Sequence, residues 1–367
     1  MGCLICWVMA FLFHRGMARN KAIGFEQSAA FEKVKECKKA GTDTMNNTFY
    51  EKLNHILAPE QIFSEEPMKN HTTFRIGGPA DWFVTPNSKE QVRQLLALVQ
   101  EEEMDVYVIG NGSNLLVGDG GIRGLVIQIG RFYSGISIEG DVVCAKAGDS
   151  LARIAQEAYK AELTGFEFAA GIPGTLGGAV TMNAGAYGGE MKDVLVSVEV
   201  LAPNGEILTL DAKDLDLSYR HSLIPEKEWI VLEAKLKLSK GEKTDIKEKM
   251  DEYSLARRTK QPLEYPSAGS TFKRPTGYFA GKLVQDSGLK GARVGGAMVS
   301  EKHSGFLINY ENATAKDMQS LICQVQKKVL EDSGELKIEL QPEVKMIGEF
   351  FPIEPMEPMI MKTKEEE

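Results

Sequence analysis

AAGIPGTLGGAVTMNAGAYGGE, residues 169–190, constrains the fold more than any other segment of this sequence. Its seven glycines are too dense for the interior of a helix or a strand, because glycine loses the most conformational freedom on folding. Glycines at this density let backbone amides approach another group closely, and exposed amides suit phosphate oxygens. The segment therefore predicts a loop region that binds a dinucleotide.

A second short glycine loop, GNGSN at residues 110–114, follows the apolar run 106–109, which predicts a strand that leads directly into the loop. Taken alone, GNGSN is equally consistent with an ordinary turn. Neither glycine segment has the G-x-G-x-x-G spacing of the Rossmann fingerprint or the lysine of a P-loop. If the two segments bind a dinucleotide, they do so without the commonest nucleotide motifs.

Around these loops the sequence alternates strand and helix signals, which predicts a mixed α/β architecture. Ser88 and Gln91 have the spacing of a capping box, and an amphipathic helical run follows them. Alternating valines at residues 196–200, with Asn204-Gly205 beyond them, predict a β-hairpin.

A polar stretch at residues 239–244 is the expected linker to a last domain, which opens with a helix. The apolar stripe of this helix consists of Ile246, Met250 and Tyr253. The next position on the same face is Arg257, where a core-facing helix would normally carry an apolar residue. The pattern predicts an arginine that turns inward.

The chain as a whole is acidic: 43 lysines and arginines stand against 52 aspartates and glutamates, and the formal charge is -9. This balance does not favour a nucleic-acid partner. The five cysteines are odd in number and lack metal-site spacing, so we expect a reducing, cytoplasmic location and no metal centre. The apolar run 3–13 is too short to cross a bilayer, and its charged residues follow it, unlike those of a secretory signal.

Three segments in order carry a family resemblance: RIGGPAD at residues 75–81, GNGSNLLV at 110–117 and the glycine-rich stretch 169–190. Together they resemble the FAD-binding half of the UDP-N-acetylenolpyruvoylglucosamine reductase (MurB) family. The resemblance implies an α/β (α+β) fold of the vanillyl-alcohol-oxidase or PCMH type, with two FAD-binding subdomains and a C-terminal substrate-binding domain. The residues that it implies for cofactor binding are Asn111, Gly112, Ser113, Asn114, Gly171, Ile172, Pro173, Gly174, Asn183 and Gly185.

The implied domain boundaries divide the chain into five parts. Residues 1–44 would be an extension outside the fold, which a translation start at Met45 would remove. The two FAD-binding subdomains would span 45–125 and 126–240, and the substrate-binding domain 241–350. Residues 351–367 alternate proline, methionine and acidic residues and are expected to form a disordered tail.

Three further motifs look like the catalytic positions of the family: SYR at 218–220, YPSAGSTFK at 265–273 and LQPEV at 340–344. They imply that NADPH reduces FAD, which then reduces UDP-N-acetylglucosamine enolpyruvate to UDP-N-acetylmuramate for peptidoglycan synthesis. Arg220 would grip the substrate carboxylate, and Ser270 would donate the proton. Glu343 would help only if it were protonated or hydrogen-bonded to a cation, because a bare carboxylate opposes the developing negative charge.

A basic stretch after residue 256 offers local positive charge for the anionic UDP-sugar. Within it, Lys260 and Lys282 are expected to contact the diphosphate. Arg274 stands where many relatives have asparagine, which leaves its contact open. The short spacing from Ser222 to Trp229 leaves no room for the tyrosine-bearing loop of one subtype, so the chain resembles the shorter subtype.

Two other functions stay open at this point. The first is an FAD oxidase or dehydrogenase of the same fold that acts on a sugar or a hydroxy acid, which applies if Arg220, Ser270 and Glu343 do not converge. The second is a flavin- or nucleotide-binding protein without turnover, which would retain FAD but oxidise no NADPH when substrate is added.

Overall fold

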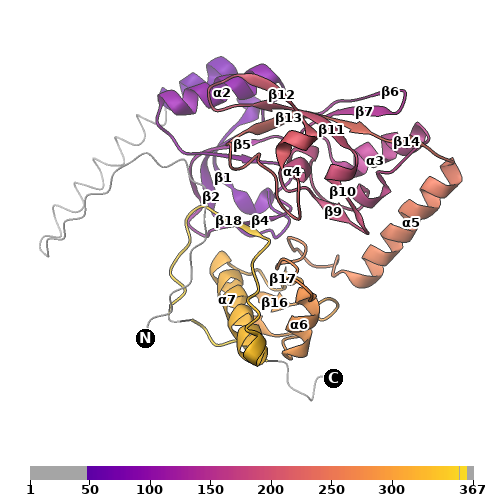
Figure 1. Ribbon diagram of the computed structural model, residues 1–367. Coiled ribbons are helices and arrows are strands. Elements are labelled where there is room, and N and C mark those ends of the chain that lie inside the picture. Colours follow the sequence, from indigo (N-terminus) through magenta and orange to yellow (C-terminus); the bar gives the residue numbers. More distant parts are fainter. Residues whose placement is uncertain (1–47, 355, 362–367) are drawn as a thin grey trace, which may run out of the picture.

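The computed structural model describes residues 48–354 and 356–361, so the predicted extension at 1–44 and the start at Met45 lie outside the described residues. The expected α/β architecture is confirmed: two sheets with flanking helices form the upper part of the molecule in Figure 1, and a smaller unit lies below them. Of the described helices, none combines the length and the apolar character that a bilayer crossing requires.

The first sheet has the strand order β1-β2-β5-β3, with β2, β5 and β3 parallel. Trp82 and Leu125 face a large core on the α2 side, whereas Phe83 and Val126 face a small core on the other side. Burial on both faces is typical of parallel strands. The elements of this unit are η1 (Pro59–Gln61), β1 (Ile62–Pro67), η2 (Met68–Asn70), β2 (Pro79–Val84), α2 (Lys89–Glu101), β3 (Val106–Ile109), β4 (Leu115–Val117) and β5 (Ile122–Gln128).

The second sheet is antiparallel, with the order β12-β11-β13-β7-β6, and the predicted hairpin at Asn204-Gly205 joins β11 to β12. Helix α4 lies against β13 and β7, helix α3 lies near β6, and Ser150 caps α3. The elements are β6 (Ile136–Glu139), β7 (Val142–Lys146), α3 (Leu151–Lys160), β8 (Leu163–Thr164), η3 (Glu167–Ala169), α4 (Leu176–Thr181), β9 (Gly185–Ala186), β10 (Gly189–Glu190), η4 (Met191–Asp193), β11 (Leu195–Leu201), β12 (Ile207–Asp211), η5 (Ala212–Leu215), β13 (Ile230–Lys237) and β14 (Ser239–Lys240).

The glycine-rich stretch differs from the expectation in one respect, because it contains a short helix. Helix α4 begins after Thr175, whose hydroxyl accepts from the amide of Gly178. A Cβ on Gly177 would lie 3.0 Å from the Cβ of Ala147, the residue directly after β7. Glycine at this position therefore lets the helix pack directly against the backbone there. Close packing outweighs the low helix propensity of glycine over these six residues.

The third unit has its own hydrophobic core and a small antiparallel sheet, β15-β16-β17, against which α7 packs. A capping box formed by Thr314 and Asp317 starts α7. The elements are α5 (Lys243–Lys260), α6 (Ala280–Asp286), β15 (Arg293–Val294), β16 (Ala297–Val299), β17 (Leu307–Asn309), α7 (Ala315–Asp332), η6 (Gly334–Leu336) and β18 (Lys345–Ile347).

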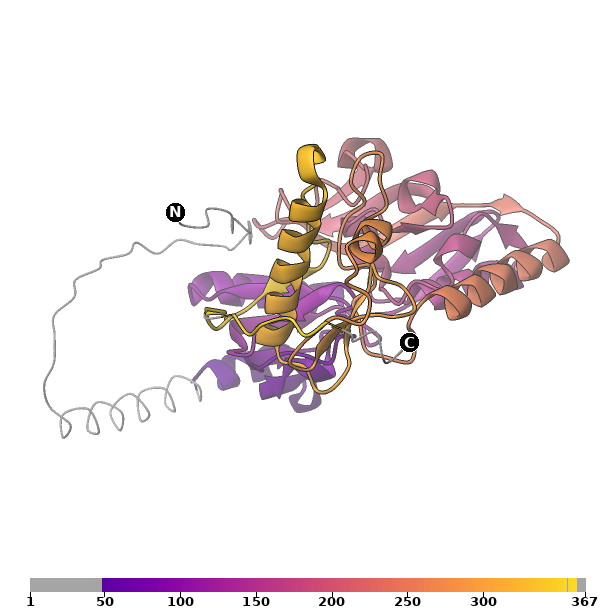
Figure 2. The same ribbon diagram turned by 90° about the horizontal axis from the view of Figure 1, so that it is seen from below.

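Two segments cross between the units. β18 pairs in parallel with β4, which ties the end of the third unit to the first. Helix α5 contacts η3, α3 and β8 of the second unit, and Figures 1 and 2 show it projecting away from α6 and α7. The stretch 239–244, expected as a linker, instead contains β14, which pairs with β8, and the start of α5.

The segment expected to be a disordered tail is ordered in part. Ile360 and Arg293 exchange two backbone hydrogen bonds, of 2.8 and 2.9 Å. The side chain of Gln324 on α7 donates to the carbonyl of Glu357 and accepts from the amide of Met359. The composition of this segment predicted no regular structure, but its backbone groups form hydrogen bonds with Arg293 and Gln324 of the third unit.

Candidate active site

The two glycine loops predicted to bind the cofactor touch each other. Loop 110–114 follows β3, and turn 171–174 lies between η3 and α4. The Asn111 side-chain amide donates to the Pro173 carbonyl at 3.3 Å. The position of a Cβ on Gly174 would be 3.6 Å from the Ser113 hydroxyl oxygen. Segments about 60 residues apart thus form one surface, as a shared ligand requires.

This surface fits a phosphate-bearing cofactor, because side chains are excluded where the backbone is most crowded. A Cβ on Gly110 would lie 2.2 Å from the Thr175 hydroxyl, and one on Gly112 would lie 2.0 Å from the His71 carbonyl oxygen. Gly112 also has a φ of +60°. Small residues at both positions keep the loop tight and its amides accessible, as pyrophosphate binding needs.

Asn183, also predicted to bind the cofactor, is fully buried, with 0% of its surface exposed. Its amide nitrogen donates to the Glu190 carboxylate at 2.6 Å and to the Ser218 carbonyl at 2.9 Å. Its amide oxygen accepts from the backbone of Lys192 at 2.9 Å. Because every polar atom of this side chain has a protein partner, Asn183 holds the turn at Ser218 in place, and its contact with the cofactor stays a prediction.

Arg220 sits on that turn and meets Glu343 from the other end of the chain. Its Nε donates to the Glu343 carboxylate at 2.6 Å, and the two side chains are only 20% and 11% exposed. Its Nη2 lies 3.5 Å from the carbonyl of Gly185, another predicted cofactor residue. Arg220 has a φ of +55°, a conformation that non-glycine residues rarely adopt and that tends to occur at functional sites. The expected cationic partner of Glu343 is therefore Arg220.

The loop that carries Ser270 is hydrogen-bonded to the backbone of Glu343. The amide of Glu343 donates to the carbonyl of Thr271, the next residue, at 2.8 Å. Ser270 itself is exposed, and Gly269 before it has a φ of +76° with open space where a Cβ would point. The Tyr219 hydroxyl accepts from the amide of Arg274 at 3.2 Å, which joins the serine loop to the arginine turn. The three predicted catalytic segments thus converge.

Asn114 makes a connection that the sequence did not suggest. Its side-chain amide donates to the Glu343 carbonyl at 3.1 Å, and its own carbonyl accepts from the amide of Lys345 at 2.9 Å. One residue of the predicted cofactor loop therefore fixes the backbone on both sides of Val344. Only the fold reveals this role, because the partners are 229 residues apart.

The two lysines predicted to bind the diphosphate differ in their surroundings. Lys282 pairs with Asp286 one helical turn later, at 2.8 Å, and its side chain is 70% exposed. Lys260 ends α5, is exposed, and has no ion-pair partner within the described ranges 48–354 and 356–361. Arg274, whose contact was left open, places its guanidinium over the Phe279 ring at 4.5 Å.

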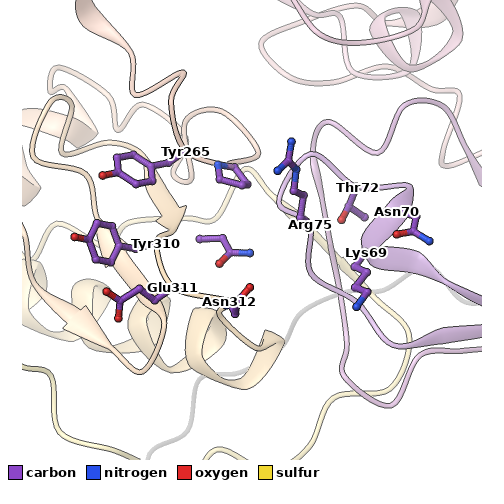
Figure 3. Close-up of a pocket in the computed structure, with 10 residues that line it drawn as sticks. Lys69, Asn70, Thr72, Arg75, Tyr265, Tyr310, Glu311 and Asn312 are labelled. Atoms are coloured by element: carbon purple, nitrogen blue, oxygen red, sulfur yellow. The ribbon is translucent and has the colours of Figure 1, made fainter.

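A pocket of about 700 Å³ opens between η2 and the third unit (Figure 3). Lys69 and Arg75 lie on one wall, and Tyr265, Tyr310 and Glu311 lie on the other. None of the predicted catalytic or cofactor residues lines this pocket. We place the candidate site at the Arg220–Glu343 pair instead. The positive φ of Arg220 and the polar groups that converge on this pair indicate an active site more strongly than the volume of a pocket does.

Two protein-family models match this chain, one in the FAD-binding part and one in the C-terminal part. A family model described as an FAD binding domain matches residues 80–211, and the UDP-N-acetylenolpyruvoylglucosamine reductase C-terminal domain matches residues 261–347. The first covers the two glycine loops, and the second contains Ser270 and Glu343.

Relatives match over nearly their whole length. UDP-N-acetylenolpyruvoylglucosamine reductases of Caldanaerobacter subterraneus and Agathobacter rectalis are each 52% identical to this chain, covering 83% of it and 100% of the relative. A crystal structure of the reductase from Thermus caldophilus superposes with a TM-score of 0.66 at 38% identity, covering 76% of this chain and 97% of that one. With identity at this level over complete relatives, the chain belongs to the UDP-N-acetylenolpyruvoylglucosamine reductase family.

Proposed function

We propose that this chain is a UDP-N-acetylmuramate dehydrogenase, a flavin-dependent oxidoreductase that reduces UDP-N-acetylglucosamine enolpyruvate with NADPH in peptidoglycan precursor synthesis. Family membership supports the activity and the use of FAD. The observation that carries the proposal for this chain is the hydrogen-bonded pair of Arg220 and Glu343 beside the Ser270 loop.

FAD, when bound, accepts hydride from NADPH and supplies hydride to the vinyl carbon of the substrate. Hydride addition there leaves negative charge on the carbon next to the substrate carboxylate. The Nε–H group of Arg220 donates to Glu343, and the two terminal nitrogens carry further N–H donors. We assign these donors to the carboxylate, where a unit charge pair at about 4 Å is worth roughly 4 kcal/mol at an effective dielectric near 20.

Ser270 is the proposed proton donor to the carbon that carries this charge. A hydroxyl is a weak acid and transfers its proton only to a strongly basic centre, which a carbanion is. The exposure of Ser270 and the open space at Gly269 are consistent with a substrate reaching the hydroxyl from solvent.

Glu343 has two roles in this proposal. Its carboxylate orients Arg220, and its negative charge is already offset by the guanidinium, so it does not oppose the charge that develops on the substrate. Asn114 would hold the Glu343 backbone while the cofactor loop carries the pyrophosphate. In this proposal Glu343 is therefore a positioning residue for Arg220.

In this proposal the two glycine loops supply the cofactor contacts, and a lysine supplies the contact with the substrate diphosphate. We assign the pyrophosphate to residues 111–114 and 171–174, and a cofactor contact to Gly185. Lys260 is the preferred diphosphate ligand, because Lys282 is already paired. We further propose a cytoplasmic location, based on the scattered cysteines.

An oxidase or dehydrogenase of the same fold for another sugar or hydroxy acid is the alternative, and the convergence of the three segments disfavours it. Purified protein should carry flavin absorbance, and under anaerobic conditions it should oxidise more than about one equivalent of NADPH per flavin only when UDP-N-acetylglucosamine enolpyruvate is added. Simple sugars and hydroxy acids serve as controls. NADPH-independent oxidation of a control substrate, or turnover by flavin-free protein, would overturn the proposal.

A further inference from the structure

Arg257 is a half-buried cation without a carboxylate partner. It lies in the last turn of α5, on the same face as Ile246, Met250 and Tyr253, as its position in the sequence predicted. Within residues 48–354 and 356–361, its guanidinium makes no ion pair or hydrogen bond. A buried charge is costly unless an opposite charge or hydrogen bonds compensate for it. The pKa of Arg257 is lowered by this burial, which Tyr187 only partly opposes.

The guanidinium lies on the turn predicted to hold the cofactor. A Cβ on Gly171 would be 3.3 Å from Cδ of Arg257 and 3.4 Å from its Nη1. Two residues further along this turn, the carbonyl of Pro173 accepts from Asn111. Arg257 therefore lies against the turn 171–174, which forms one surface with the loop 110–114.

Helix α5 is held firmly in this place. The rings of Tyr187 and Tyr253 stack with centroids 4.4 Å apart and planes at 3° to each other. The Tyr187 hydroxyl also donates to the Tyr253 carbonyl at 3.1 Å. Figure 1 shows α5 running from β14 towards the middle of the molecule. Arg257 is thus presented at the loops by a rigid element, at the end of the helix nearest to them.

We propose that Arg257 binds the pyrophosphate of FAD and supplies the formal positive charge that the glycine loops lack. The inference deepens the proposed function and rests on it. Loop amides carry only partial charges, and the chain has a net charge of -9, so a pyrophosphate gains most from a cation placed locally. A guanidinium can grip two phosphate oxygens at once. Its contact with Gly171 favours the cofactor over the diphosphate of the substrate.

Arg257→Gln tests the inference, with Lys249→Gln as the matched control. Lys249 is an exposed lysine on the same helix, so both variants lose one positive charge. Apoprotein is titrated with FAD, in the absence of substrate, and the quenching of flavin fluorescence gives Kd. We expect Arg257→Gln to raise Kd about 10- to 100-fold, the range for a charged hydrogen bond, and Lys249→Gln to change it less than about twofold. Arg257→Lys, which keeps the charge and loses the fork, should fall between them.

Three outcomes would overturn the inference: an unchanged Kd for FAD in Arg257→Gln, a raised KM for the UDP-sugar with Kd unchanged, or a shifted flavin reduction potential with Kd unchanged. The second would assign Arg257 to the substrate and the third to the flavin ring. If Arg257→Gln fails to fold by circular dichroism, Arg257→Lys decides by the same titration. Because the titration contains no substrate, its result does not depend on which substrate the enzyme reduces.

Discussion

Two arginines approach the cofactor surface from different elements, and their surroundings differ. Arg220 sits on a tight turn with a positive φ, and its charge is paired with Glu343. Arg257 sits on a regular helix, and its guanidinium has no charged partner in the described part of the chain. The first arginine is oriented by the protein, and the second is positioned but left uncompensated.

The difference separates two uses of the same residue. A paired guanidinium has fixed geometry, which suits a group that must stabilise the additional negative charge that develops beside the substrate carboxylate during the reaction. An unpaired guanidinium retains its full attraction for an anion and suits ground-state binding. The comparison predicts that Arg220 affects turnover and that Arg257 affects cofactor affinity.

The largest expected effect comes from breaking the Arg220–Glu343 pair. Arg220→Met should lower kcat about 10²- to 10³-fold, as removal of one preorganised charge stabiliser does. Glu343→Gln should lower kcat less, because Arg220 keeps its charge and loses only its orientation. In the double variant the losses should not add, since both act through one contact. Steady-state kinetics on all three, with FAD saturating, checks this; additive losses would show that the pair does not act as a unit.

The next effect concerns the support of the Arg220 turn. Asn183→Ala removes three buried hydrogen bonds and should lower the free energy of unfolding by about 1–3 kcal/mol and kcat about tenfold. Asn312→Ala is the matched control, since Asn312 also has a positive φ but is exposed. Both residues have a positive φ, so urea unfolding of the two variants separates the effect of the Asn183 side-chain hydrogen bonds from the effect of backbone strain. Equal destabilisation would mean that the Asn183 amide contributes nothing.

A smaller effect distinguishes the two lysines. Lys260→Gln should raise KM for the UDP-sugar about 5- to 20-fold with kcat nearly unchanged, the signature of lost ground-state binding. Lys282→Gln should change KM less than about threefold, because Asp286 already partners that lysine. Initial rates over a range of substrate concentration measure both. The reverse ranking would place the diphosphate at α6.

The smallest effect is on stability and depends on pH. Burial lowers the pKa of His303 below its ordinary value of 6.5. The fold therefore favours the neutral ring, so its contribution to stability is present above pH 6.5 and is lost as pH falls through the lowered pKa. Between about pH 7.5 and 5.5, urea midpoints should fall more for the wild type than for His303→Gln. An equal fall in both proteins would remove His303 from the pH dependence.

Local patterns predicted much of the fold because they depend on neighbouring residues. The capping residue Ser88, the hairpin at Asn204-Gly205 and the inward face of Arg257 follow from residue spacing alone. Helix α4 was not predicted, because its glycines are justified by packing against Ala147, a contact that spacing does not encode. The ordered tail escaped prediction for the same reason, since Gln324 and Arg293 supply its partners.

The candidate site was predictable as residue types and not as geometry. The motifs named Arg220, Ser270 and Glu343, but the direct pairing of the first with the third depends on β18 lying beside β4. Asn183 and Asn114 were assigned to the cofactor by type. The structure shows that their side chains also hold the backbone, at Ser218 and Glu343, and their contacts with the cofactor stay predictions. Polar residues in a glycine-rich loop can serve either purpose, and only their partners distinguish the two.

The central claim is that one alcohol, on the loop beside the arginine–glutamate pair, protonates the reduced substrate. An anaerobic titration of Ser270→Ala that follows flavin absorbance through both half-reactions tests it most directly. We predict that NADPH bleaches the flavin at the wild-type rate, and that reoxidation by UDP-N-acetylglucosamine enolpyruvate slows about 10²- to 10⁴-fold. Equal slowing of both half-reactions, or reoxidation at the wild-type rate, would contradict the account.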